Sequence, residues 1–140
     1  MSYRIFTIIL GAWIAGAAFP GVAIAKERVL KCELRQDGAY RATPPEVVVG
    51  YMPGQSKMVV YDSILAYYER DPVLGTVSRD DAKTFVLRWR LTDLKTSSGE
   101  TMDWRFTLAW DKKTGRANIR GGAAVSDDDN NGSGKCFFKK

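Results

Sequence analysis

The sequence predicts an all-β fold, a small antiparallel meander that closes into a barrel or sandwich of seven or eight strands. Large apolar residues recur at every second position within residues 83–120, and shorter alternating segments lie on both sides of this stretch. Such alternation is typical of strands that bury one face. Two cysteines lie near opposite ends of the predicted meander, and a disulfide between them would bring its first and last strands together. Closure of the meander would remove its exposed edges.

Residues 83–120 are expected to form three successive strands that supply most of the core. The residues that would face inward are Phe85, Leu87, Trp89 and Leu91, then Met102, Trp104, Phe106, Leu108 and Trp110, and finally Ala117 and Ile119. The polar segment 94–100 is expected to be a loop, and residues 111–115 form a short glycine-containing hairpin connection. The tryptophans are assigned to the core rather than to the wall of a ligand pocket, because a barrel this short has little room inside.

The segments before this stretch also favour strands. Residues 28–35, 46–52 and 57–63 each combine β-branched or alternating apolar residues with flanking turn residues, and the second and third would pair as a hairpin. Residues 64–70 are expected to be irregular or to form a single helical turn, capped by Asp62 or Ser63, and continuation of the preceding strand is the alternative.

The remaining segments are assigned by composition. Residues 73–82 are expected to form a short strand followed by a polar turn. Residues 121–135 are rich in Gly, Asp and Asn, which predicts a mobile loop. A short last strand would then place Cys136 and Phe138 on one face.

Residues 1–25 have the features of a cleaved secretory signal peptide. A short basic start is followed by an apolar run and by Ala23-Ile24-Ala25, a small-x-small cleavage pattern. The apolar run is too short to favour an uncleaved membrane anchor, so no transmembrane segment is expected after processing. We therefore expect residues 26–140 to form one β-barrel-like domain that is exported, into the bacterial periplasm.

Cys32 and Cys136 are expected to form a structural disulfide. An even pair of cysteines in a small exported domain usually pairs in an oxidising compartment, and the CxxC spacing of a redox pair is absent. Closing a loop of about 100 residues stabilises a fold by about 4.7 kcal/mol in the chain-entropy model.

The predicted strands also place arginines on the outer face. The mature chain keeps all 16 acids and loses only Arg4 of the 21 basic residues, which leaves a net charge of +4. Arg88, Arg90, Arg105 and Arg120 would point outward, and guanidinium groups suit carboxylate or phosphate. Two interpretations stay open: a solvated face that keeps the sheet soluble, or an anion-recognition surface.

The register of these strands can be partly predicted. With a short connection at 111–115, Thr107 faces Arg120. The longer loop before Met102 leaves two registers, in which Arg90 faces either Arg105 or Asp103.

A second candidate site is an acidic segment near the end of the chain. Asp127, Asp129 and Asn131, followed by Gly132, match the first half of a calcium-binding loop. Position twelve of such a loop needs a bidentate glutamate, but Phe138 occupies it. The alternative is a solvated acidic turn. No other cofactor is expected.

The composition argues against an enzyme. The chain contains no histidine, which excludes Ser-His-Asp and Cys-His catalysis and every His-containing metal site. A pair of carboxylates could still act as acid and base, but nothing in the sequence brings two of them together in a cleft. The carboxylates considered for this role are Asp62, Glu69, Asp71, Asp80 and Asp81.

The function expected from these observations is that of a non-catalytic binding or interaction module of the cell envelope. Its partner would be an envelope macromolecule or a small ligand, not nucleic acid, because the net charge is modest and an exported protein rarely meets nucleic acid. Two alternatives are an inhibitor of an exported lysozyme or protease, which would insert residues 127–134 into an enzyme cleft, and a structural component of an envelope assembly.

Overall fold

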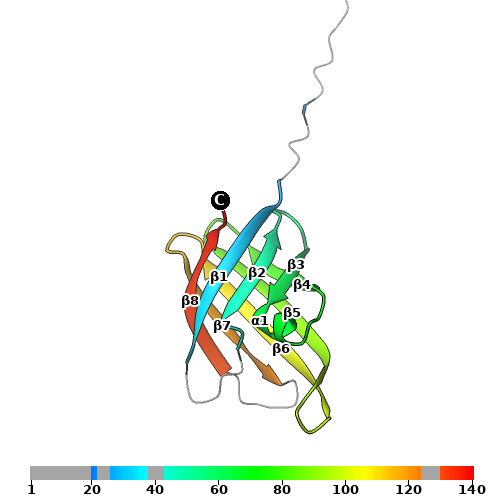
Figure 1. The fold of residues 1–140 in the computed structure, drawn as a ribbon. Helices are drawn as coiled ribbons and strands as arrows, with labels where there is room; N and C mark the ends of the chain where they lie inside the picture. The colour runs from blue at the N-terminus through cyan, green and yellow to red at the C-terminus, as the bar shows by residue number, and fades with distance from the viewer. Residues whose placement is uncertain (1–19, 22–25, 38–42, 124–129) are drawn as a thin grey trace, which may run out of the picture.

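The computed structural model describes residues 20–21, 26–37, 43–123 and 130–140, and this part of the chain forms a closed antiparallel β-barrel with one short helix (Figure 1). The strands are β1 (Arg28–Asp37), β2 (Glu46–Tyr51), β3 (Lys57–Asp62), β4 (Val73–Asp80), β5 (Thr84–Lys95), β6 (Thr101–Asp111), β7 (Arg116–Ala123) and β8 (Asn130–Phe138). Each strand pairs with its neighbour in sequence, and β8 pairs with β1. The all-β barrel is therefore confirmed, with eight strands.

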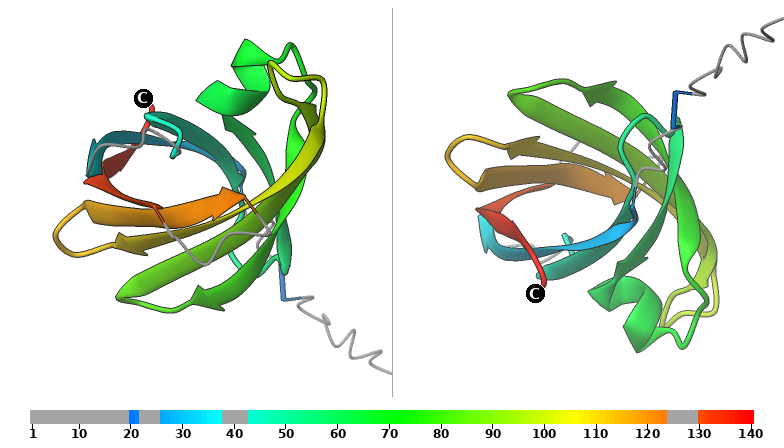
Figure 2. Two further views of the ribbon diagram at one scale, coloured as in Figure 1. Left: turned by 90° about the horizontal axis from the view of Figure 1, so that it is seen from below. Right: turned by 90° about the horizontal axis from the view of Figure 1, so that it is seen from above.

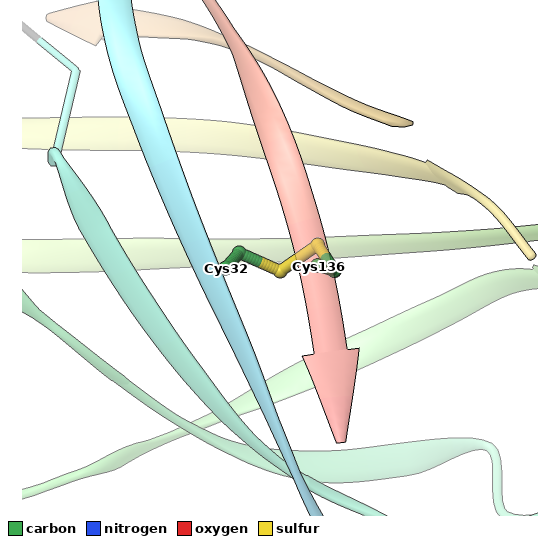
Figure 3. The surroundings of a disulfide bond; sticks show 2 residues. All are labelled: Cys32 and Cys136. Carbon is green, nitrogen blue, oxygen red and sulfur yellow. A yellow bond between two sulfur atoms is a disulfide. The ribbon is translucent and has the colours of Figure 1, made fainter. Parts of the chain in front are cut away.

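The barrel closes between β1 and β8, where the predicted disulfide is confirmed. Cys32 lies directly opposite Cys136 in the strand register, and their sulfur atoms are bonded across the pair (Figure 3). The bond joins residues that are 104 positions apart in the sequence. A disulfide of this kind indicates an oxidising environment.

Side chains fill the barrel interior. Figure 2 shows the strands surrounding the axis, and the alternating residues that they turn inward form one core. Those in the middle of this core, such as Leu30, Val49, Leu87 and Leu108, are fully buried. Because these side chains have no solvent-accessible surface, no water-sized space adjoins them, and the described residues pack the middle of the barrel with side chains.

The segment after β3 forms α1 (Ser63–Tyr67), which confirms the predicted helical turn. The carboxylate of Asp62 accepts hydrogen bonds from the backbone N–H groups of Ile64 and Leu65, both at 2.9 Å. This is the usual N-cap arrangement. Leu65 of this helix is buried in the core, and the helix lies at the rim of the barrel (Figure 2).

Two predicted loops are shorter in the structure than expected. Of the segment 94–100, Leu94 and Lys95 belong to β5, because a register shift after Leu91 lets the strand resume its pairing with β6. Within the segment 121–135, β7 continues to Ala123 and β8 begins at Asn130. Residues 130–134, assigned above to a mobile or inhibitory loop, are therefore strand, and residues 124–129 lie outside the described part of the chain.

Close strand packing explains why this composition was misleading. A Cβ atom at Gly134 would collide with the carbonyl oxygen of Glu33 on β1, and one at Gly121 would collide with that of Arg105 on β6. These glycines are needed because neighbouring backbones approach closely, and not because the chain turns.

The predicted signal peptide, residues 1–25, lies almost wholly outside the described residues. Within the ranges that the structure describes, no helix combines the length and the hydrophobicity needed to cross a lipid bilayer.

Candidate anion-binding site

The strand register brings the four predicted arginines together on the outside of the barrel. Thr76 of β4 faces Arg88 of β5, Arg88 faces Thr107 of β6, and Thr107 faces Arg120 of β7. The predicted pairing of Thr107 with Arg120 is thus confirmed. Arg88 and Arg120 lie two strands apart in this row, about 10 Å at the usual strand spacing, with a threonine hydroxyl between them.

A second row adds the other two arginines. Arg90 faces Arg105, which in turn faces Gly122 of β7. The first of the two predicted registers is therefore the correct one. Asp103 is still reached by a diagonal contact, because an Nη atom of Arg90 lies 2.7 Å from a carboxylate oxygen of Asp103. Gly122 contributes no side chain, and this leaves space beside Arg105.

We call Arg88, Arg90, Arg105 and Arg120 the arginine cluster. All four line one open depression of about 670 Å³ on the outer face of β4–β7. Leu74, Thr76 and Thr107 also line it, and none of the described residues that line it is acidic, although Asp103 contacts Arg90 from outside the lining. The depression therefore presents positive charge and hydroxyl groups together with apolar residues, of which Leu74 is the largest aliphatic one.

The ion pair between Arg90 and Asp103 does not remove this character. Both partners are solvent-exposed, with 57% and 34% of their side chains accessible, and exposed pairs contribute about 0–1 kcal/mol. Arg105 and Arg120 also have partners within the protein. Guanidinium groups keep their charge at every physiological pH and can contact an anion while holding a first partner, because each has five N–H donors.

Two other depressions lie on the outer surface. One, of about 780 Å³, covers β1, β8 and β7 and mixes Glu33 with Arg35, Arg116 and Lys135. The other, of about 300 Å³, lies beside α1. Both of these depressions have acidic residues in their lining. The depression over β4–β7 has none among the described residues and is therefore the best candidate for binding an anion.

Two polar clusters lie at the ends of the barrel, and their contacts between distant segments were not predicted from the sequence. At the end where β2 finishes, which we call the lysine end, Lys112 Nζ lies 2.5 Å from Asp80 Oδ1 and 3.2 Å from the hydroxyl of Tyr51. The Tyr51 hydroxyl also donates to Asp80 at 3.0 Å. The sequence predicts a short strand and then a polar turn within residues 73–82, and the structure places Asp80 at the end of β4, where it contacts residues from two other hairpins.

At the opposite end, which we call the helix end, Asp62 is almost fully buried. Besides capping α1, its second oxygen accepts a hydrogen bond of 2.8 Å from the indole Nε1–H of Trp89. Burial raises the pKa of Asp62 above its usual value, although the bonds from Leu65, Trp89 and Ile64 oppose this shift.

The remaining carboxylates considered for acid–base chemistry have structural contacts or lie at the surface. Asp81 bonds to Arg79 Nε at 2.6 Å and to the backbone N–H groups of Lys83 and Thr84, and these bonds hold the pKa of Asp81 far below its usual value. Glu69 and Asp71 are exposed residues that line the small depression beside α1.

The predicted calcium loop falls largely outside the described residues. Asp127 and Asp129 belong to the undescribed segment, and Asn131 is an exposed residue of β8 that faces Arg120 and Asp37. Across the described ranges, no group of three or more acidic, cysteine or histidine residues could hold a metal ion.

Comparison of the chain with protein-family models, with curated proteins and with solved structures finds no match. The function is therefore inferred from geometry and chemistry alone, because a barrel by itself does not specify a function.

Proposed function

We propose that the protein is a non-catalytic binding module of the bacterial cell envelope that recognises an anionic partner through the arginine cluster. The observation that carries this proposal is the convergence of Arg88, Arg90, Arg105 and Arg120 on one depression without an acidic lining residue. Clusters of guanidinium groups bind phosphate and carboxylate groups through charge-assisted, often bidentate, hydrogen bonds.

The predicted leader and the disulfide support an exported, periplasmic location. Residues 1–25 have the composition of a signal peptide, and the bond between Cys32 and Cys136 fits an oxidising compartment. The filled interior supports binding on the outer surface rather than inside the barrel. The lack of histidine and the structural engagement of Asp62, Asp80 and Asp81 support a non-catalytic role.

Replacing Arg90 and Arg105 with Gln tests the proposal. We expect the double variant to bind anionic envelope fragments about tenfold more weakly, because two exposed charge contacts of about 0.7 kcal/mol each are lost. Its binding should also depend less on salt, since fewer charges are neutralised. Co-sedimentation of the oxidised protein with purified envelope fragments at several salt concentrations measures both effects.

The matched control replaces Lys113 and Lys139 with Gln. Both are exposed residues outside the candidate depression, and the change in net charge is the same. Binding that is unchanged in the arginine variant, or reduced equally in both variants, would contradict recognition by the arginine cluster.

A further inference from the structure

An exposed apolar strip lies next to the arginine cluster. On the outer face, Val59 of β3 lies directly opposite Leu74 of β4, and their exposed fractions are 45% and 62%. Tyr61, two residues further along β3, points to the same side and is also exposed. We call Val59 and Leu74 the apolar pair.

The apolar pair and the arginine cluster form one continuous surface. Leu74 itself lines the depression together with Arg88 and Arg90 of β5, the strand that pairs with β4. Single exposed apolar residues need no explanation, but here two aliphatic side chains lie opposite each other at the edge of a charged cluster. The outer face of β3–β7 therefore carries exposed apolar side chains on β3 and β4 and arginines on β5–β7.

The chemistry of this face selects among anionic partners. An acidic polymer would satisfy the arginines but would leave the apolar pair in water. The surface of a phospholipid bilayer offers anionic phosphates next to hydrocarbon, so it matches both parts at once. Tyrosine side chains such as that of Tyr61, with an apolar ring and a polar hydroxyl, are favoured at this boundary.

We propose that the outer face of β3–β7 docks onto a bilayer that contains anionic phospholipid, with the apolar pair entering the headgroup boundary and the arginine cluster contacting lipid phosphates. This proposal rests on the proposed function and names its partner. The net charge of +4 for the mature chain, residues 26–140, favours an anionic surface over a neutral one.

Co-sedimentation with vesicles tests this docking. The oxidised protein, purified after export, is mixed with vesicles of phosphatidylcholine alone or with about one third phosphatidylglycerol. We expect binding to the anionic vesicles only. Replacing both members of the apolar pair with Ser should weaken that binding about tenfold, because partly exposed aliphatic surface is no longer buried. The salt dependence should stay unchanged, since no charge is removed.

The control variant replaces Val29 and Phe137 with Ser. These exposed apolar residues lie on β1 and β8, the strand pair farthest around the barrel from β4 and β5. Binding to anionic vesicles should remain at the wild-type level in this variant. Far-UV circular dichroism and urea unfolding check that each variant folds.

The outcomes separate this inference from the proposed function. If the arginine variant loses envelope binding but the protein does not bind anionic vesicles, docking to lipid is wrong and anion recognition stands. If poly-glutamate binds as tightly as the vesicles and the Ser variant of the apolar pair is unimpaired, the partner is an acidic polymer. If soluble glycerol phosphate alone displaces the protein completely, the site holds a free phosphate and not a bilayer. If the wild-type protein binds neither the anionic envelope fragments nor the anionic vesicles, both proposals are wrong.

Discussion

At the lysine end of the barrel, the carboxylate of Asp80 faces a cation, whereas at the helix end the carboxylate of Asp62 is held by N–H dipoles. Asp80 bonds to Lys112 and Tyr51, and 14% of its side chain is exposed. Asp62 accepts from Ile64, Leu65 and Trp89 and is almost fully buried. Both carboxylates join segments that are distant in sequence, but they do so with different electrostatics.

The direction of the pKa shifts shows the consequence of this difference. Burial alone would lower the pKa of Lys112, but its hydrogen bonds to Asp80 and Tyr51 outweigh burial and raise it. The charged form of Lys112 is thus favoured by folding. At the helix end, burial raises the pKa of Asp62 in spite of three hydrogen bonds, so folding disfavours its charged form. Dipoles position a buried carboxylate well, but they do not replace its lost hydration completely.

The largest effect is expected for Asp62→Ala. The variant loses the N-cap of α1, about 1 kcal/mol, and leaves the buried N–H of Trp89 without an acceptor, about 1–3 kcal/mol. Relief of the buried charge offsets part of this loss, so we expect the free energy of unfolding to fall by about 2–3 kcal/mol. Urea unfolding at neutral pH measures it. Asp71→Ala, an exposed acid at the same end, should change stability by less than about 0.5 kcal/mol. Equal effects of the two variants would show that Asp62 does not stabilise the helix end.

Lys112→Met should have an intermediate effect. Met keeps an apolar stem beside the ring of Tyr51 but removes the contacts with Asp80 and with the carbonyl of Asp81. In the wild type Lys112 and Asp80 are both partly exposed to water. We therefore expect the free energy of unfolding to fall by about 1–2 kcal/mol. The matched control is Lys113→Met, an exposed neighbour in the same turn. If Lys112→Met destabilised the fold more than Asp62→Ala, the expected order would be wrong, and the contacts of Lys112 would stabilise the barrel more than those of Asp62.

The smallest effect is expected in the pH dependence of the free energy of unfolding. There the contribution of Asp62 has the opposite sign to that of the turn acids Asp81 and Asp111. Since the pKa of Asp62 is raised by folding, its protonation favours the folded state, and its contribution to stability falls as pH rises from about 4 through the folded pKa. In Asp62→Asn this contribution is absent. Urea unfolding between about pH 4 and pH 7 should therefore show a stability gain on acidification that is larger in the wild type than in the Asn variant.

Turn acids give the opposite dependence at lower pH. Hydrogen bonds from Arg79, Thr84 and Lys83 lower the pKa of Asp81, so the stability it provides is present above about pH 4 and is lost as pH falls through its folded pKa. Asp111 behaves in the same way, because the backbone N–H groups of Thr114 and Lys113 lower its pKa. The stability gain between about pH 7 and pH 4 is assigned to Asp62 and not to these turn acids. If the free energy of unfolding had the same pH dependence in the wild type and in Asp62→Asn, that assignment would be wrong.

The fold was largely predictable because its determinants are local. Alternation of inward residues such as Phe85, Leu87 and Trp89 specifies which face is buried, and a short turn fixes the register of Thr107 against Arg120. The cap at Asp62 was one of two predicted positions. For the same reason, the sequence could predict the arginine cluster: outward positions on three consecutive strands follow from the same alternation.

The missed features depend on contacts between distant segments. The composition of residues 130–134 indicates a loop, but Gly132 and Gly134 are strand residues that let β8 approach its neighbours. The contacts of Lys112 with Asp80 and of Trp89 with Asp62 join residues about 30 positions apart, and no local pattern specifies them. The apolar pair likewise becomes visible only when the register of β3 with β4 is known.

The position of β8 between β7 and β1 has a consequence for how the molecule matures. Until residues 130–138 have joined the sheet, two rows of unpaired backbone N–H and C=O groups would be open to association with other strands. For the exported chain proposed above, the ring of strands can close only after β8, which pairs with β1, has been delivered. Oxidation of Cys32 with Cys136 then retains a completed ring, so the redox state of these two sulfurs should report whether assembly has finished.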